Sequence, residues 1–128
     1  MTKTLTLITM SQGNTQALRR TFESYAPHCQ QIVYGDVLLF EDDREAVRAM
    51  QKDFPLEIVA FPFNFIFLHG FSAILNALAY NAKTDYVTYA NCSEIIDPNF
   101  PIQLNLLDDD AFNCFFFRHA VEQHRWVR

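Results

Sequence analysis

The chain alternates between short runs of apolar and β-branched residues and longer segments in which apolar residues recur every three or four positions. The short runs predict four strands, at residues 5–9, 32–34, 56–61 and 85–90. The longer segments predict helices between them, with Ser11 as the N-cap of the first and Asp42 or Asp43 as the N-cap of the second. This alternation predicts an α/β fold: a mostly parallel, Rossmann-like sheet with helices on both faces.

A cluster of polar residues follows the fourth predicted strand. The strand, residues 85–90, carries little charge and is rich in Tyr, Val and Thr, so we expect a central strand buried on both faces. Asn91, Cys92, Ser93 and Glu94 come directly after it. Open α/β sheets bind ligands at the carboxyl ends of their strands. The sequence therefore predicts the functional site at this edge.

The pattern changes after Pro98. Residues 104–110 predict a short helix or turn with an acidic surface, and residues 112–118 (FNCFFFR) predict a fifth strand. The chain then stops after residue 128 without a closing helix or a polar tail. We interpret this ending as a truncated fold.

Composition and charge exclude several classes of protein. The 128 residues suit one domain, residues 1–128, and a hydrophobic content of 50% predicts a globular chain. A net charge of −5 argues against a nucleic-acid groove, and no apolar run is long enough for a membrane span. The 3 cysteines show no paired spacing, which suits reduced thiols and a cytoplasmic location.

Three segments together resemble the inverting, nucleotide-sugar-dependent glycosyltransferases of the GT-A-fold family 2. Residues 18–25 (LRRTFESY) resemble the helix after that family's first strand, and residues 70–87 (GFSAILNALAYNAKTDYV) resemble its Gly-x-Ser-x-x-x-Asn helix and the Asp-Tyr-Val strand. Residues 90–98 (ANCSEIIDP) align without a gap with its Asp-x-Asp-Glu segment, and residues 124–128 (HRWVR) resemble a later Trp-x-Arg strand. The resemblance implies a GT-A-type fold that transfers a sugar, with inversion, from a UDP-type nucleotide-diphospho-sugar to a hydroxyl acceptor.

By this resemblance, the first half of the sheet binds the nucleotide. The end of the first strand, at Thr9, Met10 and Ser11, would lie along the ribose and base. Asp36 matches an Asp that accepts the uracil N–H, a role that suits a carboxylate because it is purely an acceptor. The alternative is that Gly35 and Asp36 form a turn closed by an Asx hydrogen bond.

The metal-binding segment departs from the family pattern. The family's Asp-x-Asp holds a divalent metal, Mg²⁺ or Mn²⁺, which prefers hard and charged oxygen ligands. Here those positions are the neutral residues Asn91 and Ser93, and only Glu94 keeps a charge. We assign Asn91 to the nucleotide, and Ser93 and Glu94 to a weak metal site. Three outcomes stay open: a weakened metal, metal-free catalysis, or the loss of transfer.

Two further family positions bear on catalysis. Asn76 keeps the family's Asn and is assigned to nucleotide binding, with a purely structural role as the alternative, whereas Leu75 replaces the usual Arg. A catalytic base is indispensable, since a sugar hydroxyl is a poor nucleophile, but in the family it lies beyond the matched region. The acidic triplet at residues 108–110 suits a solvated turn, so no base is assigned. The alternative function is a catalytically degenerate, non-enzymatic sugar-nucleotide-binding or scaffold domain.

An unusually apolar stretch begins at Phe61 and ends at Phe71 (FPFNFIFLHGF). Part of it must enter the core. The rest predicts a covered surface, either in a homo-oligomer or against further parts of the domain. A nucleotidyltransferase on a similar sheet is a weaker alternative, because no Gly-rich or basic phosphate loop follows the first strand.

Overall fold

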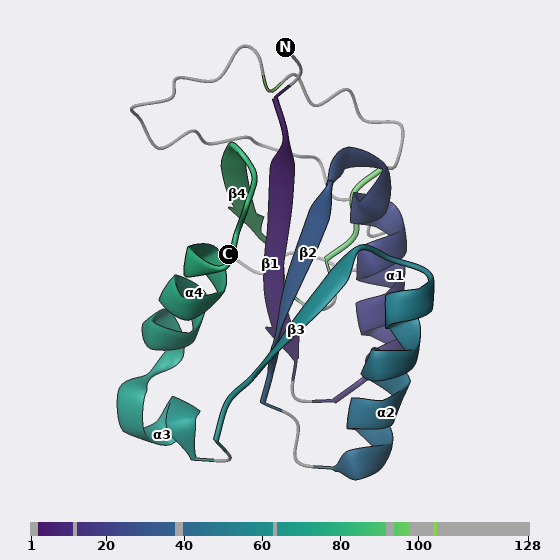
Figure 1. Cartoon of the computed structure of the whole chain (residues 1–128). Coiled ribbons are helices and arrows are strands. Elements are labelled where there is room, and N and C mark those ends of the chain that lie inside the picture. The colour runs from purple at the N-terminus through teal and green to yellow at the C-terminus, as the bar shows by residue number, and fades with distance from the viewer. Residues whose placement is uncertain are drawn as a thin grey trace, which may run out of the picture.

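The computed structural model describes residues 3–11, 13–37, 40–62, 64–91, 94–97 and 104. Strands and helices alternate along this part of the chain, as Figure 1 shows. In order, the elements are β1 (Leu5–Ser11), α1 (Thr15–Tyr25), β2 (Gln31–Asp36), α2 (Glu41–Ala49), β3 (Leu56–Ala60), α3 (Phe65–His69), α4 (Phe71–Tyr80) and β4 (Tyr86–Tyr89). Short 3₁₀ turns, η1 (Ala26–His28) and η2 (Met50–Lys52), extend α1 and α2.

The four strands form one parallel sheet in the order β3-β2-β1-β4. Helices α1 and α2 cover one face, and α3 and α4 lie on the other (Figure 1). Each β-to-β connection passes through a helix, as parallel strands require. The predicted α/β, Rossmann-like fold with helices on both faces is confirmed.

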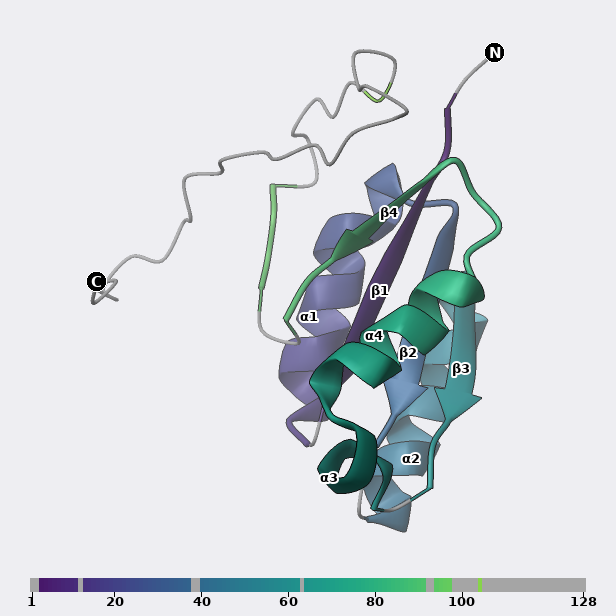
Figure 2. The same cartoon turned by 90° about the vertical axis from the view of Figure 1, so that its left-hand side faces the viewer.

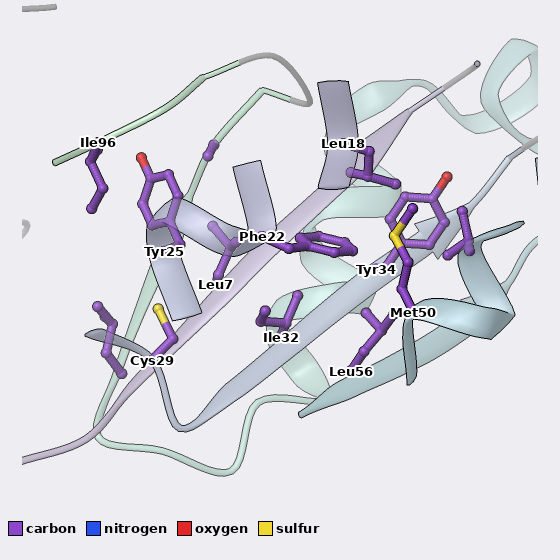
Figure 3. Packing of buried hydrophobic residues seen from close by; sticks show 13 residues of the cluster. Leu7, Leu18, Phe22, Tyr25, Cys29, Ile32, Tyr34, Met50, Leu56 and Ile96 are labelled. Atoms are coloured by element: carbon purple, nitrogen blue, oxygen red, sulfur yellow. The ribbon is translucent and has the colours of Figure 1, made fainter. Parts of the chain in front are cut away.

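The larger core lies between the sheet and the pair α1 and α2. Alternate strand residues such as Leu7 and Ile32 point to this face because side chains alternate along a strand. Phe22 of α1 is fully buried and meets the rings of Tyr34 and Phe54 edge-on, at centroid distances of 6.3 and 5.6 Å. Figure 3 shows the Phe22 ring lying between Leu7 and Tyr34 at the centre of this cluster.

The smaller core lies between the sheet and α4. Ile74 and Leu78, one helical turn apart, are fully buried against the strands. Gly35 of β2 lets the helix approach closely: a Cβ at this position would lie 3.3 Å from Ile74 Cγ2 and 3.3 Å from Leu78 Cδ1. The glycine therefore sets the spacing between α4 and the sheet.

Helix and strand boundaries differ from the sequence prediction, most clearly in two helix caps and at the end of β2. The N-cap of α1 is Asn14, whereas Ser11 belongs to β1. Neither Asp42 nor Asp43 caps α2; both lie in its first turn, where a carboxylate still favours the positive end of the helix dipole. Strand β2 continues through Gly35 and Asp36, so the alternative of a turn at these residues is wrong.

The position of β4 also differs from the prediction. In the described part of the chain, β4 pairs only with β1 and lies at the margin of the sheet. Val87 is 42% exposed, so the expectation of a central strand buried on both faces is wrong for these residues. A short run of β-branched and aromatic residues suits an edge strand as well as a central one, because the pattern does not encode neighbours. The predicted fifth strand, the acidic turn and the HRWVR segment lie outside the described residues, except Leu104.

Candidate functional site

The order of the strands creates a reversal between β1 and β4. From β1 the chain moves outward to β2 and β3, and α4 then returns it to the opposite side of β1. Figure 2 shows β4 and β3 at opposite margins, with β1 and β2 between them. Connections that leave neighbouring strands in opposite directions open a crevice at their carboxyl ends. The end of β1, the end of β4 and the residues after β4 therefore frame the candidate site.

The end of β1 is tied into the sheet by its side chains. Thr9 and Ser11 are buried, and Met10 packs in the core on the α4 face. Thr9 Oγ1 donates to the carbonyl of Ala90 at 2.6 Å and so joins the ends of β1 and β4. Ser11 Oγ shares a hydrogen bond of 2.8 Å with the hydroxyl of Tyr34. The predicted nucleotide residues are thus at the expected edge, but their side chains face inward.

Asp36 lies at the end of β2, directly beside Ser11 of β1 and Ala60 of β3. Its carboxylate faces Arg44 of α2, with Nε at 3.2 Å from Oδ2 and 3.4 Å from Oδ1. The Asp36 side chain is only 11% exposed, so only a small part of its carboxylate is accessible to a ligand. Arg44 is a site residue that the sequence analysis missed, because eight positions separate it from Asp36 and no motif links them.

Asn91 and Glu94 form a hydrogen-bonded loop just after β4. The Glu94 carboxylate accepts from Asn91 Nδ2 at 2.8 Å and from the Asn91 backbone N–H at 3.2 Å. Tyr89 donates its hydroxyl to Asn91 Oδ1 at 2.5 Å. The structure therefore brings these two predicted site residues together, with the amide holding the carboxylate in place.

The proposed metal ligands are only partly described. Ser93 and Cys92 lie outside the described residues. Within the described ranges, no three His, Cys, Asp or Glu side chains gather as a metal-binding group.

Glu94 also influences Tyr25, whose pKa is raised to about 12, mainly by burial and secondly by the negative charge of Glu94.

Asn76 lies on helix α4. It is exposed on α4, while Ile74 and Leu78, two positions away on either side, are fully buried. Leu75, at the position of the family's Arg, packs partly buried against the α4-side core. The structure thus places Asn76 on an exposed helix surface.

The turn from β1 to α1 adds the start of a helix to the site. Gly13 and Asn14 both have positive φ, 144° and 50°, and Asn14 accepts from the N–H of Ala17 at 3.1 Å. No acidic residue lies in the first turn of α1, so its positive end is uncompensated by a carboxylate there. A helix start of this kind favours anionic groups. The edge therefore combines hydroxyls, a carboxylate, a guanidinium and a helix start.

Comparisons with known proteins show a likeness at the level of fold alone. No protein-family model matches the chain, and no curated protein matches it either. Among solved structures, S. aureus TarS residues 1–349, a GT-A-like glycosyltransferase, matches with a TM-score of 0.61 and 13% sequence identity. The match covers 74% of this chain and 29% of that chain, so this chain spans less than a third of the TarS structure. In the described ranges, no helix has the length and apolar character to cross a membrane. Over the matched part, the chain shares the α/β fold of TarS, a parallel Rossmann-like sheet with helices on both faces.

Proposed function

We propose that this chain is the donor-binding part of an inverting glycosyltransferase. It binds a UDP-type sugar nucleotide at the carboxyl ends of β1, β2 and β4, and the sugar is transferred to a hydroxyl acceptor. The observation that carries the proposal is the reversal of strand order between β1 and β4, with polar residues at those strand ends. The fold likeness to TarS supports it.

The polar and charged groups at the carboxyl edge of the sheet suit the base and the diphosphate of a UDP-sugar. Asp36 offers an acceptor for the base N–H at the end of β2. The start of α1, without acidic residues in its first turn, suits the diphosphate. Asn91 would contact the nucleotide, while Glu94, with Ser93 as a further ligand, would offer hard oxygens to Mg²⁺ or Mn²⁺. The cation would supply positive charge to the leaving diphosphate.

Calorimetric titration of the chain with UDP-sugars and GDP-sugars, with and without Mn²⁺, tests this function. We expect UDP-sugar binding that Mn²⁺ strengthens, and we expect Asp36→Asn to weaken it by about tenfold or more, because hydrogen bonds to charged groups contribute about 1.5–3 kcal/mol. Asp53→Asn is the matched control, since Asp53 also pairs with an arginine, Arg19, at 2.7 Å, but away from the sheet edge.

The possible results separate the alternatives. Binding that Mn²⁺ does not change would favour a degenerate nucleotide-sugar binder over a transferase. Equal weakening by the Asp36 and Asp53 variants would contradict the assignment of the base to Asp36. A chain that binds none of the nucleotides, although circular dichroism shows it folded, would overturn the proposed function.

A further inference from the structure

Arg44 lies between two carboxylates at the edge of the candidate site. Its Nε is 3.2 Å from Asp36 Oδ2, and its Nη1 is 3.9 Å from Glu41 Oε2. Glu41 also accepts from Arg48 Nη1 at 2.8 Å. The spacing of Glu41, Arg44 and Arg48 on α2 places all three on one side of the helix. The four residues form a continuous charged row that ends at Asp36.

The two arginines of this row differ in how far their side chains are buried. The side chains of Asp36 and Arg44 are 11% and 30% exposed, whereas those of Glu41 and Arg48 are 59% and 53% exposed. Ion pairs between exposed side chains contribute little and are screened by salt. A carboxylate that is largely buried needs a partner for its charge, because an uncompensated buried charge is strongly unfavourable. Arg44 therefore compensates Asp36 through a direct contact, whereas Arg48 pairs with Glu41 at the surface and interacts with Asp36 only through its charge.

A backbone hydrogen bond also fixes the position of the Arg44 main chain. The N–H of Arg44 donates to the carbonyl of Phe40 at 3.2 Å, in the first turn of α2. Strand β2 fixes the other partner, since Asp36 pairs with Ala60 of β3 in the sheet. One guanidinium nitrogen, Nε, contacts both oxygens of Asp36, and this contact holds the carboxylate against α2. The orientation of Asp36 is thus set by two rigid elements.

We propose that Arg44 is a positioning residue that holds the Asp36 carboxylate where it can accept from a nucleobase, and so makes the site prefer nucleobases with a ring N–H. Uracil and guanine present a ring N–H to such an acceptor, whereas the corresponding ring nitrogens of cytosine and adenine are themselves acceptors. A carboxylate has about four lone-pair positions, so pairing with a guanidinium and accepting from a base are compatible. This inference rests on the proposed nucleotide-binding function and names the class of base it takes.

Titration calorimetry with UDP, GDP, CDP and ADP tests the inference on the wild type, Arg44→Gln, Arg44→Lys and the matched control Arg48→Gln. We expect the wild type to prefer UDP or GDP over CDP and ADP by about tenfold to a hundredfold, the range of one hydrogen bond to a charged group. Arg44→Gln should abolish most of this preference, and Arg48→Gln should keep it. Arg44→Lys retains the charge but removes the Nε that contacts both Asp36 oxygens, so we expect a partial preference.

The outcomes are distinguishable. If the wild type binds UDP and Arg44→Gln keeps both affinity and preference, Arg44 has no positioning role and the inference is overturned, while the proposed function stands. If the wild type binds none of the four nucleotides, both fail together. Circular dichroism verifies that each variant is folded; should Arg44→Gln not fold, an unchanged base preference in Arg44→Lys would overturn the inference by itself.

Discussion

Tyr34 connects the core to the candidate site within a single side chain. Its ring is fully buried and packs against Phe22, while its hydroxyl reaches Ser11 at the carboxyl edge. A buried tyrosine usually finds such a partner for its hydroxyl. The packing of α1 against the sheet is therefore linked to the position of the end of β1. At the residue scale, core and site are parts of one arrangement.

Cys29 and Tyr25 give the molecule a dependence on alkaline pH. Burial raises the pKa of the Cys29 thiol from 9.0 to about 12. The pKa of Tyr25 is likewise raised, from 10.0 to about 12, by burial first and then by the charges of Glu94 and Cys29. In both cases the folded chain keeps a proton that the unfolded chain loses. The free energy of unfolding therefore falls as pH rises from 9 through 12.

We predict that Cys29→Ala flattens this dependence. Wild-type stability should fall by roughly 1 kcal/mol per pH unit for the thiol once the pH exceeds its ordinary pKa. Urea unfolding at pH 8 and pH 10.5 measures the difference between the two conditions for each protein. The difference, rather than stability itself, is compared, because alanine also removes a packed sulfur. An equal loss in wild type and Cys29→Ala would contradict the prediction.

At the element scale, α1 shows that the backbone of the preceding turn determines which residue caps the helix. The sequence analysis assigned the cap to Ser11, the first residue of the right chemistry after the apolar run. In the structure β1 extends to Ser11, so the chain turns later, at Gly13 and Asn14, and Asn14 adopts left-handed geometry with φ of 50°. Asparagine tolerates this conformation better than most residues.

We predict that Asn14→Ala lowers the free energy of unfolding by about 1–2 kcal/mol. Alanine loses the hydrogen bond to the Ala17 N–H and is strained at positive φ. Asn14→Gly should cost less, because glycine adopts this φ readily. Urea denaturation of both variants measures the effect, with Gln16→Ala, an exposed change in the same helix, as the control. An Asn14→Ala variant as stable as Gln16→Ala would show that the cap contributes nothing.

At the scale of the whole molecule, the strand order determines which parts open most easily. Strands β1 and β2 each have a neighbour on both sides, whereas in the described part of the chain β3 and β4 have a neighbour on one side only. The two inner strands are covered by a hydrophobic core on each face of the sheet. Such regions open only with the global unfolding of the domain.

We predict that amide hydrogens of Leu7, Ile8, Ile32 and Val33 exchange most slowly, and that those of β3 and β4 exchange faster. Native-state hydrogen exchange followed by NMR measures this ranking. The physical reason is that outer strands release their backbone hydrogen bonds by local opening, without exposing either core. Exchange in β4 as slow as in β1 would contradict the ranking and would indicate a further neighbour for β4.

The candidate site was predictable only in part. Polar residues directly after an apolar run placed Asn91 and Glu94 at a strand end, and the family resemblance placed Ser11 and Asp36 at strand ends. The structure puts all four there. Asn76 shares a motif with the family but lies on the exposed surface of α4. A motif records residue types and spacing, and it does not record which way a helix turns its side chains once packed.

The sequence by itself determined the elements, because the period of apolar residues dictates which face of each helix or strand can be buried. From this followed the alternation of strands and helices, the parallel sheet and its two covered faces. Only the tertiary structure decided the order β3-β2-β1-β4 in the described part of the chain, the pairing of β4 with β1, and the pairing of Asp36 with Arg44. These depend on contacts between residues distant along the chain, which a local pattern cannot encode and which packing against a particular neighbour selects.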